Sequence, residues 1–141
     1  MRAATLLLAF GLTLNAANAA HAADEAGREA ARVTVTRQLE AFRTDDAATA
    51  YAQAAPVIQG MFPSPDSFLA MVRKGYAAVY RARSFSVDRT EDVGSDGVAL
   101  GVKLQDEAGA DWLALYTLEK QPDGAWRITG CRLTKAPGTD A

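Results

Sequence analysis

The side chains able to do chemistry in this chain are mainly carboxylates, tyrosines and arginines, because its 141 residues include 1 histidine and 1 cysteine. Serine and cysteine nucleophiles usually need a nearby imidazole as base, and zinc sites commonly use histidine as a ligand. The single histidine, His21, lies in an N-terminal stretch that we expect to be removed. The sequence therefore disfavours these kinds of chemistry and predicts no metal and no other cofactor.

The most specific candidate for a ligand site is the set Tyr80, Arg83, Trp112 and Tyr116. Trp112 and Tyr116 lie four residues apart in an alternating segment, so on a β-strand they share one face. Tyr80 and Arg83 precede the first expected strand, where an aromatic ring and a guanidinium suit a ligand with an apolar body and a carboxylate. A core aromatic cluster capped by one arginine has the same composition, and the sequence leaves both interpretations open.

A second polar feature is a group of cations around Gly75: Arg73, Lys74, Arg81 and Arg83. A guanidinium can bind a carboxylate through two hydrogen bonds, so the group could bind an anion. Cations also accumulate at the C-terminal ends of helices, where they oppose the negative pole of the helix dipole. A solvated helix end is the simpler interpretation.

Two residues of the last expected strand are predicted to be structural. Cys131 has no second cysteine with which to form a disulfide, so we expect it to be a small buried residue. Trp126 begins the alternation Trp126, Ile128 and is expected to be buried against the helices.

Helices occupy the first part of the folded region. Apolar residues recur at helical spacing over 25–43, where the faces of Ala31, Val35, Leu39 and Phe42 coincide. The segment 44–46 (Thr-Asp-Asp) predicts the N-cap of a second helix, and a short apolar turn follows at 57–62. The pair at 64–65, a serine followed by proline, predicts the start of another helix, which ends near Gly75.

From residue 84 onward the period changes to two, which predicts four strands. Turn-forming clusters at 94–97, 106–109 and 122–124 separate them at intervals typical of an antiparallel meander. Helices followed by strands predict an α+β domain in which N-terminal helices pack on a curved four-stranded antiparallel sheet, a cone-like half barrel.

The first residues have the layout of an export signal. A basic start at Arg2 precedes an apolar run over 3–14 and small residues around His21, so residues 1–22 are predicted to be a signal peptide. We expect the mature chain to begin at Ala20 or Ala23 and the protein to be periplasmic or secreted. The remaining chain is predicted to be one domain over 23–135, followed by a disordered tail over 136–141.

Overall charge and hydropathy exclude two classes of partner. The chain carries 15 basic and 17 acidic residues, which is not the balance of a nucleic-acid-binding protein. No apolar run reaches the roughly 18 residues that a membrane span needs.

Four segments carry a resemblance to a known family: 38–46 (QLEAFRTDD), 55–62 (APVIQGMF), 68–84 (FLAMVRKGYAAVYRARS) and 115–131 (LYTLEKQPDGAWRITGC). The chain resembles an exported bacterial family known as a domain of unknown function, number 4864. That family is similar to the cystatin-like, nuclear-transport-factor-2-like (NTF2-like) superfamily. The resemblance implies a pocket between the helices and the concave sheet, and dimerisation through the sheet, but no activity. Ala77 and Ala78 stand where prolines are expected.

Enzymes of that superfamily generally use a pocket acid or base together with a tyrosine, which implies an Asp–Tyr pair here. Simpler roles exist for each candidate, namely helix capping, an exposed strand end or core packing. The candidates are Asp45, Asp46, Asp111, Tyr51, Tyr76, Tyr80 and Tyr116.

Two functions therefore remain open. The first is a non-catalytic exported module that binds a small apolar or carboxylate-bearing ligand, or a protein partner. The second is a small pocket enzyme of the isomerase or dehydratase type.

Overall fold

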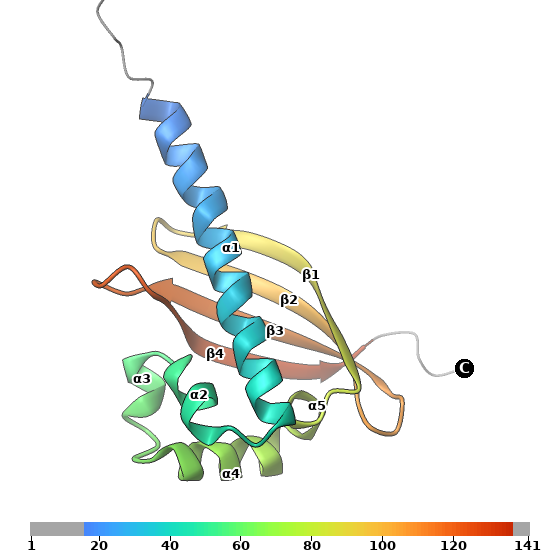
Figure 1. Ribbon diagram of the computed structural model, residues 1–141. Coiled ribbons are helices and arrows are strands. Elements are labelled where there is room, and N and C mark those ends of the chain that lie inside the picture. Colours follow the sequence, from blue (N-terminus) through green and yellow to red (C-terminus); the bar gives the residue numbers. More distant parts are fainter. Residues whose placement is uncertain (1–15, 137–141) are drawn as a thin grey trace, which may run out of the picture.

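The computed structural model describes the backbone of residues 16–136 and the side chains of residues 25–136 (Figure 1). Within this range the chain forms helices first and strands afterwards, as the change of period predicts. The elements are α1 (Ala16–Arg43), α2 (Ala47–Ala52), α3 (Pro56–Gln59), α4 (Pro65–Gly75), α5 (Ala77–Tyr80), β1 (Ser84–Val93), β2 (Gly97–Gln105), β3 (Asp111–Lys120) and β4 (Trp126–Lys135).

The four strands form one antiparallel sheet in the order β1-β2-β3-β4, which confirms the predicted meander. The three hairpin turns each contain a glycine with positive φ, a conformation that other residues adopt at a cost: Gly94, Gly109 and Gly124. The register pairs Tyr116 of β3 with Leu100 of β2 on one side and with Cys131 of β4 on the other. Because directly opposed residues point to the same face, these three side chains lie on one side of the sheet.

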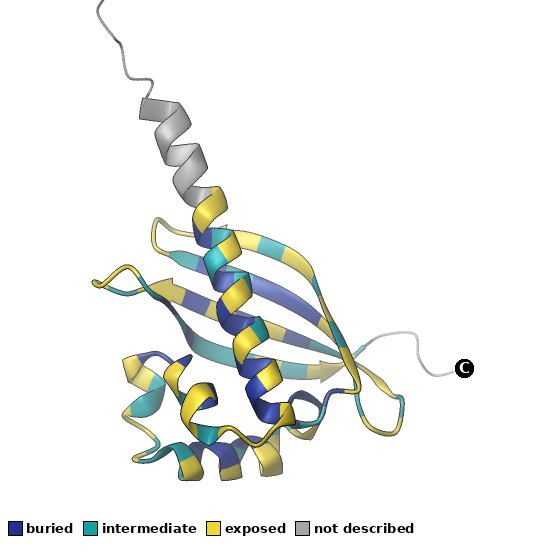
Figure 2. Ribbon diagram, in the orientation of Figure 1, coloured by how far each residue is buried: buried dark blue, intermediate teal, exposed yellow. Residues whose placement is uncertain are grey.

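Helix α1 crosses that face of the sheet, and its buried stripe is turned toward the strands (Figures 1 and 2). Ala31, Val35, Leu39 and Phe42 are each no more than 1% exposed, as their helical spacing predicts. They pack in one core with the inward residues of β2 and β3, namely Val98, Leu100, Val102, Leu104, Ala114, Tyr116 and Leu118. The predicted α+β architecture, with helices on one face of a curved sheet, is confirmed.

Short helices complete the cover, and their caps follow the sequence. Asp46 begins α2 by accepting a hydrogen bond from the Thr49 N–H at 3.1 Å, and Ser64 begins α4 in a capping box with Ser67. The single-turn helix α5 is not predicted by the pattern. It buries Val79 and Tyr80.

The segment between α2 and α3 pairs with the outer edge of β4. The Ala55 N–H donates to the Ile128 carbonyl oxygen at 2.8 Å, and the Ile128 N–H donates to that of Gln53 at 2.9 Å. These bonds pair the chain with the β4 edge at Ile128, directly before α3 begins at Pro56.

At the N-terminus, α1 begins at Ala16, upstream of the predicted Glu25. The extra turns are rich in alanine, the residue with the highest helix propensity. Residues 1–15 and 137–141, and the side chains of 16–24, lie outside the described residues, so the signal peptide, its cleavage sites and the tail stay predictions. No helix in the described part is long and apolar enough to span a membrane.

Candidate functional site

An apolar cavity of about 260 Å³ lies between the inward face of β3 and β4 and the helices α1, α3 and α4. Aromatic, aliphatic and methionine side chains make up most of its wall, and none of the described lining residues is charged. The lining residues are Gln38, Phe42, Ile58, Met61, Phe62, Phe68, Met71, Val72, Tyr76, Val79, Tyr116, Ile128, Thr129, Gly130 and Cys131.

Phe68 of α4 is the centre of the helical wall. Its ring centroid lies 6.0 Å from that of Phe62, 5.8 Å from that of Tyr51 and 6.3 Å from that of Phe42. The Tyr51 hydroxyl donates to the Phe62 carbonyl oxygen at 2.7 Å, which fixes the loop between α3 and α4. Ring packing and this bond therefore position the wall opposite the sheet.

Tyr116 is the most distinctive polar residue of the cavity. Its side chain is 1% exposed, and its buried hydroxyl has no hydrogen-bond partner among the described residues. Burial raises the pKa of this phenol well above its ordinary value, so the hydroxyl keeps its proton. Leaving a buried hydroxyl without a partner costs about 1–3 kcal/mol, which makes it a ready donor to an incoming acceptor.

Cys131 and Tyr76 flank this hydroxyl. The Cys131 thiol lies beside it without a hydrogen bond of good geometry, and burial raises the pKa of this half-buried thiol to about 12. Tyr76, at the break between α4 and α5, reaches across to β4, where its hydroxyl donates a long bond to the Cys131 carbonyl oxygen at 3.4 Å. Tyr116, Tyr76 and Cys131 thus form the polar end of an otherwise apolar cavity.

The four site residues predicted from the sequence lie in different places. Tyr116 lines the cavity, and Trp112 shares its face of β3 but lies beyond the cavity, where its indole N–H donates to Asp106 Oδ2 at 2.8 Å. Arg83 is exposed, and its guanidinium lies against the β2–β3 turn at Gly109. Tyr80 is buried among α1, α4 and α5, away from the cavity lining. A ligand-binding role for the four together stays a prediction.

An Asp–Tyr pair does exist, formed by Asp45 and Tyr80. The Tyr80 hydroxyl donates to Asp45 Oδ1, and Arg81 Nη2 lies 2.8 Å from Asp45 Oδ2. The hydrogen bond from Tyr80 and the pairing with Arg81 lower the pKa of this exposed carboxyl. A pocket base of the isomerase type needs a carboxyl with a raised pKa inside the cavity, and this pair instead clamps the end of α1 to α5.

The four cations that the sequence groups around Gly75 also lie in different places. The Arg73 and Arg81 guanidinium carbons lie 5.4 and 4.1 Å from the centroid of the Tyr80 ring, typical of cation–π contacts. Lys74 is exposed at the end of α4 and lines a separate hollow described below.

Residues that the sequence pattern did not single out complete the site. Gln38 is 4% exposed on α1 and donates through Nε2 to the Ala50 carbonyl oxygen at 3.1 Å. Its position beside the apolar stripe at Val35 and Leu39 is the signal that could have identified it. In the described part of the chain, no three His, Cys, Asp or Glu side chains gather as a metal site would require.

Solved structures with a similar fold confirm the architecture. A domain of unknown function with a cystatin-like fold from Nostoc punctiforme aligns with a TM-score of 0.58 at 18% identity, covering 81% of this chain and 80% of that one. An NTF2-like protein of unknown function from Shewanella baltica gives 0.54 at 14% identity, covering 78% and 94%. A ketosteroid isomerase-like protein from Erwinia carotovora atroseptica gives 0.53 at 14%, covering 78% and 97%. At these identities the likeness shows the fold alone.

No curated protein matches the chain in sequence. A family model does match, over residues 24–141, which is nearly all of the region that follows the expected signal peptide. The chain therefore belongs to the family described as a domain of unknown function (DUF4864), with an NTF2-like, cystatin-like α+β fold.

Proposed function

We propose that this protein is an exported, non-catalytic module that binds a small ligand with an apolar body and a polar head group. The observation that carries the proposal is the buried Tyr116 hydroxyl, which has no hydrogen-bond partner among the residues that the structure describes and lies in an apolar cavity whose described lining carries no charge. A ligand oxygen that accepts its proton would remove the cost of the missing hydrogen bond. The apolar body would gain free energy from leaving water, at about 25 cal/mol per Å² buried.

The volume of the cavity limits the size of that ligand. Benzene fills an engineered cavity of about 150 Å³, and drug-sized ligands occupy about 300–1,000 Å³. At about 260 Å³ the cavity suits a molecule of one or two rings or a medium-length alkyl chain.

Methionines supply adaptability at the mouth. Met61 is 65% exposed and Met71 half-buried, and both line the cavity. Unbranched thioether side chains repack easily around ligands of different shape. This wall therefore supports binding of a range of apolar molecules.

Binding is favoured over catalysis because the described lining offers no carboxyl, imidazole or amine that could act as a base. The Asp45–Tyr80 pair lies outside the cavity, and its carboxyl has a lowered pKa. The isomerase or dehydratase alternative draws no support from these residues.

Export is part of the proposal and rests on the sequence of residues 1–22. N-terminal sequencing of the protein from the periplasm or culture medium should find Ala20 or Ala23 first. An exported chain that still begins with Met1 would contradict the predicted signal peptide.

Association of two copies through the sheet also stays a prediction. The outer face carries Leu115, which is 44% exposed and lies opposite Arg132 in the register. Sedimentation velocity of the purified protein measures the oligomeric state directly.

The binding proposal is tested by isothermal titration calorimetry with 1-decanol. Wild-type protein should bind it, and Met71→Trp, which fills the cavity, should weaken binding at least about tenfold. Val93→Trp is the matched control, because Val93 is 56% exposed on the β1–β2 hairpin. Absence of binding to the wild type, or equal binding to all three proteins, would contradict the proposal.

A further inference from the structure

A second hollow adjoins the cavity along the outer edge of β4. We name it the vestibule; its lining includes Lys74, Tyr76, Trp112, Cys131, Arg132 and Leu133. Tyr76 and Cys131 line both the vestibule and the cavity. The Tyr76 hydroxyl donates a long hydrogen bond of 3.4 Å to the Cys131 carbonyl oxygen, so the two shared residues lie against each other where the hollows adjoin.

The two parts differ in charge. The cavity has no charged residue in its described lining, whereas the vestibule has two, Lys74 and Arg132, both cations. A third cation is close, because Lys135 Nζ lies 5.8 Å from the centroid of the Trp112 ring. The carboxylate nearest to this ring, Asp106, is bound by the Trp112 indole N–H and does not line the vestibule.

Arg132 is an exposed residue of β4. It neighbours Cys131 in β4 and so leaves the strand toward the opposite face of the sheet. It is nevertheless among the residues that line the vestibule. Because β4 is an edge strand, a long side chain on its outer face is able to reach around the edge. Lys74 approaches from the other wall, at the end of α4.

The buried donor lies at the boundary between the parts. Tyr116 lines the cavity and is directly opposite Cys131 in the register, and Cys131 is one of the two residues that the hollows share. A head group that accepts the Tyr116 proton therefore lies where the apolar wall ends and the cationic wall begins. The apolar body would extend the other way, toward Phe62, Phe68 and Met71.

We propose that the ligand is an amphiphile with a carboxylate head, held by Tyr116 at the boundary and by Lys74 and Arg132 across the vestibule. This inference rests on the proposed binding function and adds the chemical class of the head group. A carboxylate matches both features, since it accepts a hydrogen bond strongly and is attracted to ammonium and guanidinium groups.

The test compares decanoate with 1-decanol, which share the alkyl chain and differ in charge at pH 7.5. Wild-type protein should bind decanoate more tightly than 1-decanol. The double variant Lys74→Met/Arg132→Met should bind decanoate roughly tenfold more weakly and 1-decanol unchanged, and raising the salt concentration should weaken only decanoate. Each single variant should give part of the loss.

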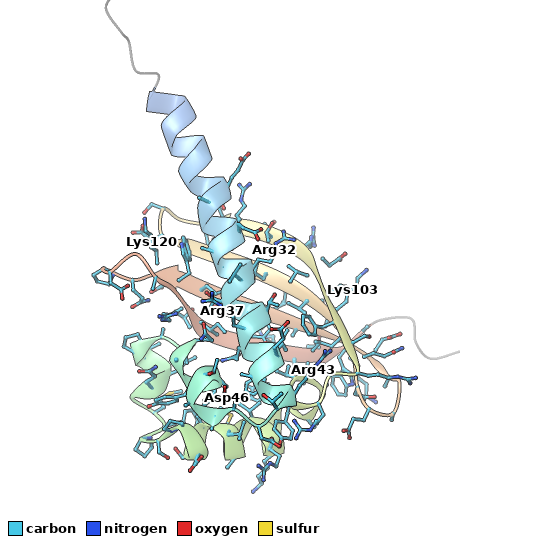
Figure 3. All side chains as sticks on the ribbon, in the orientation of Figure 1. Arg32, Arg37, Arg43, Asp46, Lys103 and Lys120 are labelled. Carbon is cyan, nitrogen blue, oxygen red and sulfur yellow. The ribbon has the colours of Figure 1, made fainter. Side chains whose placement is uncertain are left out.

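Lys120→Met is the matched control, because it removes an exposed cation far from the vestibule (Figure 3). Lys120 is the last residue of β3, whereas Trp112 lies near the start of the same strand. It should leave the affinity for decanoate unchanged. Equal affinity of the double variant and the wild type for decanoate, or an equal loss in Lys120→Met, would overturn the inference while 1-decanol binding still supports the proposed function. Failure of both ligands to bind the wild type would instead overturn the proposed function itself.

Discussion

The two halves of the helical cover use the same sheet face in opposite ways. Under α1 the interface is filled: Val35 and Leu100 are 0% exposed, and Leu39 is 1% exposed. Under α3 and α4 the same face, at Tyr116 and Cys131, borders the cavity. We call these the packed half and the hollow half.

The difference follows from the lengths of the elements. Helix α1 lies along the sheet with a continuous apolar stripe, whereas α3 is one turn of 4 residues and α4 has 11. The two short helices cover less of the sheet than α1 does, and the cavity lies between them and the sheet. The packed half should therefore determine stability and the hollow half ligand binding.

The largest effect is expected at Trp126 in the packed half. It is 9% exposed, its carbonyl oxygen accepts from the Thr34 hydroxyl at 3.0 Å, and its ring covers Gly27. Trp126→Ala should lower the free energy of unfolding by about 3–5 kcal/mol. In the hollow half, Met61→Ala should lower it by less than about 1 kcal/mol, since Met61 is 65% exposed.

Urea unfolding followed by circular dichroism measures both variants. A Trp126→Ala midpoint equal to that of the wild type would mean that this ring does not support the core. Equal losses in the two variants would remove the distinction between the halves.

Replacing either of two glycines by alanine should change stability less than Trp126→Ala does, and the two replacements should act in opposite directions. A Cβ on Gly27 would lie 2.8 Å from Trp126 Cζ2, so overpacking of about 1–3 kcal/mol outweighs the higher helix propensity of alanine. At Gly75 in the vestibule, such a Cβ would meet no atom of the described residues within 4 Å, apart from its chain neighbours and the backbone of its own helix. We expect Gly27→Ala to lower the unfolding midpoint and Gly75→Ala to raise it slightly. Thermal melts that rank them the other way would contradict tight packing at Gly27.

The smallest effect on stability is expected at Asp45, which clamps the end of α1 to α5. Its folded-state pKa is lowered by the Tyr80 hydrogen bond and by Arg81, so it stabilises the fold above its ordinary value of 3.8. That stabilisation is lost as the pH falls through the lowered folded value. Asp45→Asn keeps the left-handed backbone, which asparagine tolerates at φ 54°, but removes the charge.

The unfolding midpoint of Asp45→Asn should therefore lie below that of the wild type at pH 7 and converge with it in acid below about pH 3.8. Glu40→Gln, an exposed carboxyl on α1, is the control. A constant difference between Asp45→Asn and wild type at every pH would show that the charge is not responsible.

The fold was largely predictable because its elements carry clear local signals. Helical spacing predicted the buried stripe of α1. Asp46 and Ser64 predicted the starts of α2 and α4. The alternation of apolar residues predicted all four strands. The shared face of Trp112 and Tyr116 was predicted for the same reason. These features depend on residues close together in sequence.

Of the four site residues predicted from the sequence, Tyr116 lines the cavity and Trp112 the vestibule, and a binding role for the four together stays a prediction. The other parts of the candidate site depend on long-range packing. Helix α5, at 4 residues, is too short to show a period, and it turns Tyr80 toward Asp45 instead of toward Trp112. Whether a buried hydroxyl has a partner depends on every element around it, so the unpaired state of Tyr116 has no local signal. Lys74 belonged to the predicted group of cations around Gly75. In the structure Lys74 lines the vestibule, whereas Arg73 stacks on the Tyr80 ring.

The most direct test of the central claim is Tyr116→Phe, measured for stability and for 1-decanol binding. The wild-type hydroxyl is buried without a hydrogen-bond partner among the described residues, so its removal should leave the free energy of unfolding unchanged or raise it by up to about 1 kcal/mol. The same variant should bind 1-decanol about three- to tenfold more weakly, because one hydrogen bond is lost. A loss of stability above about 1 kcal/mol with unchanged binding would make Tyr116 a structural residue and contradict the proposed site.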